Sequence, residues 1–136
     1  MTASQPTKEQ IEELLKADQT VPVAMVNLLK FKDKATYAEG TPEASENLTG
    51  AEAYARYGAG VVKVLANIGA KSIFFGPVEG YVIGGGEEWD SVAIVIYPTR
   101  TAFLNMTQSE AYQAIHYHRD AGLEHQQLIA TNPGNL

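Results

Sequence analysis

The chain has 136 residues, of which 45% are hydrophobic, and its 16 acidic and 10 basic side chains give a formal charge of −6. This length predicts a single domain over 1–136, with an N-terminal helical appendage at 1–20, a core at 21–131 and a tail at 132–136. No lysine or arginine run is present, so the composition excludes a nucleic-acid footprint. The absence of cysteine excludes disulfides and thiolate chemistry.

The beginning of the chain, MTASQPTKEQIEELL, is polar and then amphipathic, which is not the order of a signal peptide. No apolar run approaches the roughly 20 residues that a helix needs to span a bilayer. We therefore expect a cytoplasmic protein without a membrane partner.

The first predicted elements are a helix and a strand. Thr7 and Gln10 have capping-box spacing and predict a helix over 7–17. Residues 21–32, VPVAMVNLLKFK, are apolar on both alternating faces, which is typical of a strand covered on both sides. The polar stretch 33–50 is long for a connection and is either a lid or interface element or a surface insertion.

A second capping box at Thr49 and Glu52 starts a helix that we expect to end at Gly69. The following run, KSIFFGPVEGYVIGGG, predicts a strand interrupted by a bulge at Gly76-Pro77, because proline cannot donate a ladder hydrogen bond. The GGGEEWD turn then leads into a strand, SVAIVIYP, that is again apolar on both faces.

The last part of the chain predicts two helices and a strand. Thr99 and Ser109 are N-cap residues for a short helix and for a longer one that ends before Gly122. EHQQLIAT is polar enough for an edge strand. The order βαββαβ after an extra N-terminal helix predicts a ferredoxin-like α+β fold.

This fold predicts an assembly. The two main helices cover one face of the sheet, yet two strands are apolar on both faces, so the second face needs another cover. A second copy of the same sheet is the simplest cover. We therefore expect a homodimer, packed sheet against sheet as a dimeric α/β barrel.

Several segments carry a family resemblance: EAYARY at the start of the second helix, WD before a buried strand, and YPTRTAF followed by SEAY. Over roughly 23–131 the chain resembles the family called domain of unknown function 1330, in the dimeric α/β-barrel superfamily. The resemblance implies a small pocket in each subunit, as in cofactor-free monooxygenases, isomerase-like enzymes and haem-binding proteins. It implies no particular activity, because a shared fold does not fix function.

All three histidines, His116, His118 and His125, lie in AIHYHRDAGLEH. His116 and His118 point about 160° apart on a helix, whereas two histidines that share a metal need a spacing of three or four residues. His125 lies beyond Gly122 on the final strand. We expect neither a metal site nor any other cofactor.

His118 and Arg119 are the candidate reactive pair, because helical spacing places both on the side expected to face the sheet. In a functional interpretation, His118 is an acid/base catalyst and Arg119 orients a ligand carboxylate or enolate. In the structural alternative, the histidine is hydrogen-bonded at the helix end and the arginine pairs with an acid such as Glu124.

Four further residues are candidate ligand contacts. Asn27 is a polar residue within an apolar strand, and a buried amide must find partners. Tyr57 can present its hydroxyl to a cavity or fill the core. Trp89 either forms a pocket mouth or packs on the turn, and Tyr97, at the end of a buried strand, has the same two interpretations.

These patterns predict that the protein binds or transforms a small, partly hydrophobic organic molecule without metal or nucleotide. Catalysis, if present, is proton transfer by His118, with Arg119, Asn27 and Tyr57 orienting the ligand, as in cofactor-independent monooxygenases or isomerases. A non-catalytic dimeric binding or interaction module is the alternative. Haem binding through a histidine is a third possibility, which rests on the superfamily alone.

Overall fold

The computed structural model describes residues 5–134, so parts of the predicted appendage and tail, 1–4 and 135–136, lie outside the described residues. The elements in chain order are α1 (Lys8–Lys16), β1 (Val23–Phe31), the 3-10 turn η1 (Pro42–Ser45), α2 (Gly50–Asn67), β2 (Lys71–Pro77), β3 (Ser91–Tyr97), α3 (Arg100–Thr107), α4 (Glu110–Gly122) and β4 (Leu123–Thr131).

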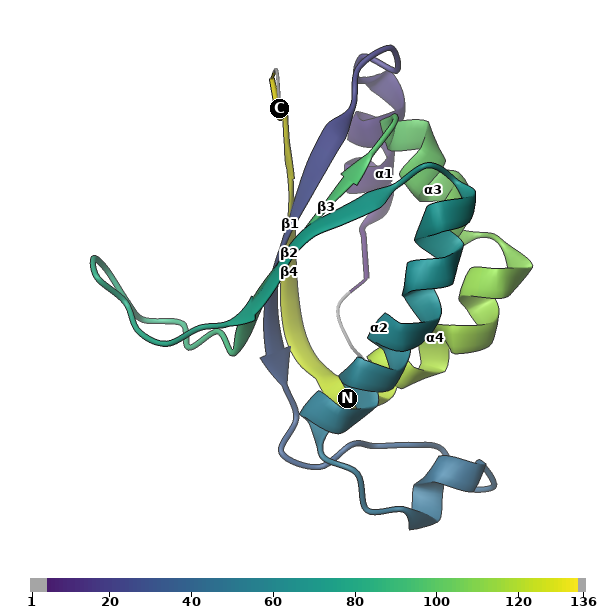
Figure 1. Ribbon diagram of the computed structural model, residues 1–136, viewed down its shortest axis with the longest axis vertical. Coiled ribbons are helices and arrows are strands. Elements are labelled where there is room, and N and C mark those ends of the chain that lie inside the picture. The colour runs from purple at the N-terminus through teal and green to yellow at the C-terminus, as the bar shows by residue number, and fades with distance from the viewer. Residues whose placement is uncertain (1–4, 135–136) are drawn as a thin grey trace.

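The four strands form one sheet in the order β2-β3-β1-β4, and each pair of neighbours is antiparallel. The helices lie on one side of this sheet (Figure 1). After α1 the chain follows the βαββαβ order, with α3 and α4 together in the second helical position. The predicted ferredoxin-like α+β fold with an extra N-terminal helix is confirmed.

The helices begin where their capping residues predict. The hydroxyls of Thr7 and Thr49 accept hydrogen bonds from the backbone N–H groups of Gln10 and Glu52, whose side chains reach back to complete both capping boxes. Ser109 caps α4 in a similar way through the N–H of Tyr112. These starts were predictable because each rests on hydrogen bonds within one turn.

The segment after β2 differs from the prediction. The bulge lies between Ser72 and Phe74 rather than at Gly76-Pro77, and β2 ends at Pro77. Residues 78–90, here called the arm, leave the sheet on the side away from the helices (Figure 1). Val82 and Ile83 in the arm are 98% and 92% exposed. The apolar residues of the arm therefore resemble a strand in the sequence, but they pair with no strand among the described residues.

The core lies between the sheet and the helices, around fully buried Val23, Met25, Leu29 and Leu123. The ends of α2 and α4 approach so closely at Gly50 and Gly122 that a Cβ at either position would clash with backbone atoms. This close crossing fixes the last turn of α4, which carries Arg119, against the beginning of α2.

The other face of the sheet, here called the open face, carries no helix (Figure 1). Cross-strand register places Val26 of β1 beside Ile94 of β3 and Ile129 of β4, and Phe74 of β2 on the other side of Ile94. Phe74 and Ile129 are about half exposed. Apolar side chains from all four strands thus meet on a face that this chain leaves uncovered.

Candidate ligand-binding cavity

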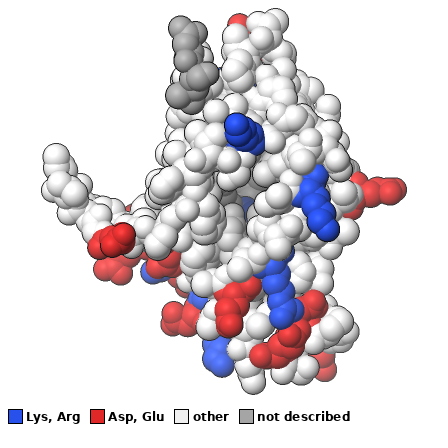
Figure 2. Space-filling model, viewed as in Figure 1, with Lys and Arg blue, Asp and Glu red and all other residues white. Residues whose placement is uncertain are grey.

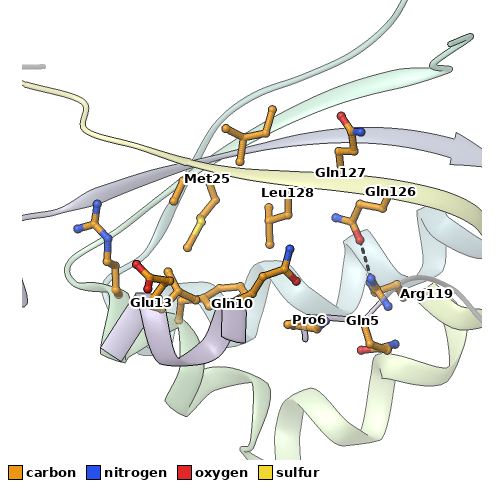
Figure 3. A pocket seen from close by; sticks show the side chains of 14 residues that line it. Gln5, Pro6, Gln10, Glu13, Met25, Arg119, Gln126, Gln127 and Leu128 are labelled. Atoms are coloured by element: carbon orange, nitrogen blue, oxygen red, sulfur yellow. Dashed lines mark hydrogen bonds between the residues drawn. The ribbon is translucent and has the colours of Figure 1, made fainter. Parts of the chain in front are cut away.

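A cavity of about 670 Å³ lies between the N-terminal segment with α1, α3 and the edge strand β4. Figure 3 shows Gln10 and Glu13 of α1 on one side of this cavity and Leu128 of β4 on the other. Its apolar walls come from Pro6, Leu14, Met25, Phe103, Leu128 and Ala130. The volume and the apolar walls are typical of a site for a small organic molecule.

The polar side chains of the cavity come from several elements. They are Gln5, Gln10, Glu13, Arg100, Arg119 and Gln126, whereas the side chain of Gln127, which also borders the cavity, points to the other side of β4 (Figure 3). Two arginines and one glutamate therefore line the cavity, and this balance favours a ligand with negative charge.

Arg119 is held at the cavity by a chain of hydrogen bonds. It is 8% exposed, and its guanidinium donates to the side-chain oxygen of Gln126 at 2.5 Å. The Gln126 amide donates in turn to Asn27 Oδ1 at 2.8 Å. Asn27 Nδ2 completes the chain by donating to the carbonyl oxygens of Ala93 and Met25 at 3.2 and 3.3 Å. The arginine is thereby tied to the sheet, and its orientation is fixed.

Asp120 balances the charge of Arg119 from the other direction. One carboxylate oxygen lies 3.1 Å from the Arg119 guanidinium, and the other lies 3.3 Å from Nδ1 of His116. Burial lowers the pKa of His116 below its usual value; Asp120 opposes this shift and Arg119 adds to it. His116 is thus predominantly neutral at neutral pH, and the Arg119–Asp120 pair is close to electroneutral.

Comparison with known proteins identifies the family. The model of the domain of unknown function DUF1330 matches residues 43–132. The chain belongs to the DUF1330 family. A crystal structure of methylated RPA0582 protein is 36% identical, covering 98% of this chain and 96% of its own, with a TM-score of 0.84. No curated protein matches the chain.

Two other solved structures are similar to the chain. One, of the RPA0582 protein of unknown function from Rhodopseudomonas palustris, is 34% identical over 97% of both chains, with a TM-score of 0.83. A protein of unknown function from Bacteroides fragilis NCTC 9343, described as dimeric with a ferredoxin-like fold, is 12% identical. It covers 85% of this chain and 99% of its own, with a TM-score of 0.53, and this likeness concerns the fold alone.

The DUF1330 match includes Arg119 and Gln126 but begins after α1 and β1. The cavity therefore lies between the matched segment and the N-terminal part of the chain, which contributes the Gln10, Glu13 and Leu14 wall. Family membership places the fold, and the family's description assigns no function to this wall.

His118 lies away from this cavity, contrary to the expectation that it shares the sheet-facing side with Arg119. Its Nδ1 is 2.7 Å from the Tyr37 hydroxyl, and its ring lies 4.1 Å from that of Tyr117. Tyr117 donates a hydrogen bond to one carboxylate oxygen of Glu43, a residue that is only 7% exposed. The other oxygen of Glu43 is buried and has no hydrogen-bond partner among the described residues. The 33–49 segment thus covers this side of α4, a contact that helical spacing alone could not reveal.

Tyr57, Tyr97 and Trp89 are likewise outside the cavity walls. Tyr57 donates to the Tyr112 hydroxyl at 3.1 Å in the core, and burial raises its pKa well above the usual value. Tyr97 is buried, and its ring packs edge-on against Phe103. Trp89 stacks on His125 beside a smaller hollow of about 210 Å³. Of the six predicted site residues, only Asn27 and Arg119 belong to the network at the cavity.

The described residues give no geometric support to a metal or haem centre at the cavity. Within 5–134, no group of three or more histidine, aspartate or glutamate side chains is arranged to hold a metal ion. No histidine is among the residues of this range that line the cavity. Among the helices in the described part of the chain, none combines the length and apolarity required to cross a bilayer.

Two functional candidates were missed from the sequence, Gln126 and Asp120. Gln126 lies in the polar strand that we assigned to a sheet edge, and its polarity was attributed to exposure. A signal was nevertheless present, because strand alternation places Gln126 and Leu128 on the same face. Asp120 follows Arg119 directly and was not weighed as its partner.

Proposed function

We propose that the protein binds a small, largely apolar organic molecule that carries one oxyanion, with the oxyanion at Arg119. The observation that carries this proposal is the position of Arg119 in the wall of a cavity that is otherwise lined mainly by apolar side chains. An apolar cavity with a few oriented polar groups is the usual form of a small-molecule site. The Gln126 and Asn27 contacts support it by holding the guanidinium in place before a ligand arrives.

A carboxylate ligand can share or replace Asp120 at the guanidinium. The Asp120 side chain is 37% exposed and can turn toward water, so its displacement leaves no buried charge unpaired. A guanidinium presents five N–H donors in a planar fork that matches a carboxylate. The apolar part of the ligand would then contact Met25, Phe103 and Leu128.

Titration calorimetry with octanoate and with octan-1-ol tests this proposal, because the two probes share an apolar chain and differ in charge. Octanoate is expected to bind more tightly than the alcohol. Arg119→Met should weaken octanoate binding about tenfold to a hundredfold, the value of a charge-assisted hydrogen bond, and change octan-1-ol binding little. Arg56→Met is the matched control, since Arg56 pairs with Glu46 on the exposed side of α2. Equal affinity for both probes would contradict a role for Arg119 in binding.

The proposal assigns ligand orientation to Arg119 and leaves catalysis by His118 as a prediction. A ligand in the cavity would contact Arg119 and Gln126, whereas the contacts of His118 are with Tyr37 and Tyr117. These contacts favour the structural alternative for His118. Binding without chemistry is therefore the form of the function that the geometry supports best.

We further propose that the protein forms a homodimer that buries the open face. We also propose that the protein works in the cytoplasm. The half-exposed Phe74 and Ile129 support a sheet-to-sheet contact, because exposed apolar patches mark interaction surfaces. The fold relative from Bacteroides fragilis is described as dimeric, in line with this arrangement. Cell fractionation would test the location.

A further inference from the structure

A continuous chain of polar contacts leads from His116 to the cavity. His116 Nδ1 lies 3.3 Å from one oxygen of Asp120, and the other oxygen lies 3.1 Å from the Arg119 guanidinium. Arg119 continues the chain to Gln126. The two-residue spacing of His116 and His118 argued against a shared metal ion, and the proposed binding site does not include His116. It is nevertheless connected to the cavity through these contacts.

We propose that His116 and Asp120 couple anion binding in the cavity to uptake of one proton by His116. This inference rests on the proposed function, because it requires an anionic ligand at Arg119. Such a ligand competes with Asp120 for the guanidinium, and the Asp120 carboxylate then interacts more fully with His116. The proton comes from solvent and resides on the imidazole, which becomes an imidazolium paired with Asp120. The ligand itself is not altered.

The charges around the cavity give the direction of this coupling. With neutral His116, Arg119 and Asp120 together carry no net charge next to the ligand. Protonation of His116 adds one positive charge, so the protonated protein should bind an anion more tightly. By linkage, a bound anion in turn favours protonation of His116. Affinity for an anion should therefore rise as the pH falls.

Groups from several elements surround the His116–Asp120 pair. Arg119 and the Tyr112 ring lie on the same helix, with the ring centroids of Tyr112 and His116 5.3 Å apart. The Lys32 ammonium, from the segment after β1, donates to the backbone carbonyl of Asp120 at 3.2 Å. The neutral amide of Gln5 contacts Asp120 Oδ1 at 3.4 Å. The positive charge of Arg119 disfavours protonation of His116, and an anion at Arg119 would offset this effect.

His118 provides a matched control within the same helix. It is also a partly buried histidine with a pKa that burial lowers, but its ring nitrogen contacts Tyr37. Among the described residues, no hydrogen bond or ion pair joins His118 to Asp120, and His118 does not line the cavity. Replacement of His118 should therefore leave the proton coupling of the cavity in place.

Octane-1-sulfonate is a suitable probe, because its sulfonate stays ionised throughout the range in which histidine titrates. Calorimetric titrations at about pH 5.5 and about pH 7.5, each in two buffers of different ionisation enthalpy, measure both affinity and proton uptake. The full-length protein is expected to bind about fivefold more tightly at the lower pH, with proton uptake on binding. His116→Gln should abolish both effects, whereas His118→Gln should keep them.

The possible outcomes separate the two proposals. Sulfonate binding with equal affinity at both pH values and no proton uptake would overturn the coupling and leave the proposed function standing. Loss of the pH dependence in His118→Gln, with retention in His116→Gln, would also overturn it. No binding at either pH would remove the proposed function and, with it, this inference. Asp120→Asn gives a second check, since it should strengthen binding at about pH 7.5 by removing the competing carboxylate.

Discussion

The guanidinium of Arg119 donates to the side-chain oxygen of Gln126 at 2.5 Å, and this contact joins the end of α4 to the edge strand β4. Both residues line the cavity. Because Gln126 also donates to Asn27 in the neighbouring strand, one amide orients a cationic group and satisfies a polar residue of the sheet. This dual role makes Gln126 the residue whose loss would report most clearly on the network.

Replacement of Gln126 by leucine should destabilise the protein and weaken octanoate binding. The change removes the donor to Asn27 Oδ1 and one acceptor of the Arg119 guanidinium, which costs about 1–3 kcal/mol of the free energy of unfolding. Urea unfolding and calorimetry measure the two effects. Gln127→Leu is the control, because Gln127 points away from Arg119 on the other side of β4 (Figure 3). Equal losses in both variants would argue against the network.

Filling the cavity should block binding without unfolding the protein. Ala130 lines the cavity and is exposed, so Ala130→Phe adds a ring to open space rather than to the packed core. We expect octanoate binding to fall at least roughly tenfold while the free energy of unfolding changes by less than about 1 kcal/mol. Ala59→Phe on the exposed side of α2 serves as the control. Unchanged binding in Ala130→Phe would place the ligand elsewhere.

The pH dependence of stability should decrease when His118 is replaced by glutamine. Burial lowers the pKa of His118 in the folded protein, and Glu43 opposes this shift. The unfolded chain therefore binds more protons, and the stability contributed by neutral His118 is present above about pH 6.5 and lost as the pH falls through the folded pKa. Thermal unfolding at about pH 7.5 and about pH 5 should show a smaller difference for the variant. A larger difference would contradict the assignment.

The open face should mediate dimerisation. Ile94 lies between Val26 and Phe74 in the register of this face, so a charge there would be buried between two sheets. Light scattering after gel filtration should give the mass of a dimer for the unmodified protein and of a monomer for Ile94→Glu. Ala59→Glu, on the helical side, should remain dimeric. A monomeric unmodified protein would refute the sheet-to-sheet arrangement.

The tip of the arm, residues 80–86, is an uncharged extension beside the same face. Residues 80–86 contain no charged side chain, and Figure 2 shows the outer part of the arm without charge, with acidic side chains nearer the sheet. The arm, which carries the exposed Val82 and Ile83, leaves the sheet on the side where a second copy would pack (Figure 1). Their exposure in one chain is therefore consistent with the proposed dimer.

Local patterns predicted the fold well. The capping boxes at Thr7 and Thr49 fix helix starts through contacts within a single turn, and strand alternation identified both faces of β1 and β3. The segment beyond Pro77 was predicted wrongly. Tyr81, Val82 and Ile83 are residue types that favour strands, but they pair with no strand among the described residues. Pairing between strands is non-local, and alternation does not report it.

The site was predictable only in part, for a similar reason. Asn27 was found because a polar residue in an apolar pattern must have partners, and Arg119 because helical spacing placed it on the side of its helix expected to face the sheet. Their link, Gln126, was missed, because its burial depends on how the end of α4 packs on β4. His118 was expected beside Arg119 from helical angles, and the 33–49 segment draws it instead toward Tyr37. Such contacts between distant segments leave no periodic signal.

The central claim is that the cavity at Arg119 binds an organic anion. Nitrogen-15 NMR spectra of the side-chain N–H groups, recorded during titration with octanoate, test it most directly. The account predicts that the Arg119 and Gln126 side-chain signals shift together and saturate, while the Arg56 signal stays in place. Shifts confined to groups around Trp89 and His125, or no saturating shift at Arg119, would contradict it.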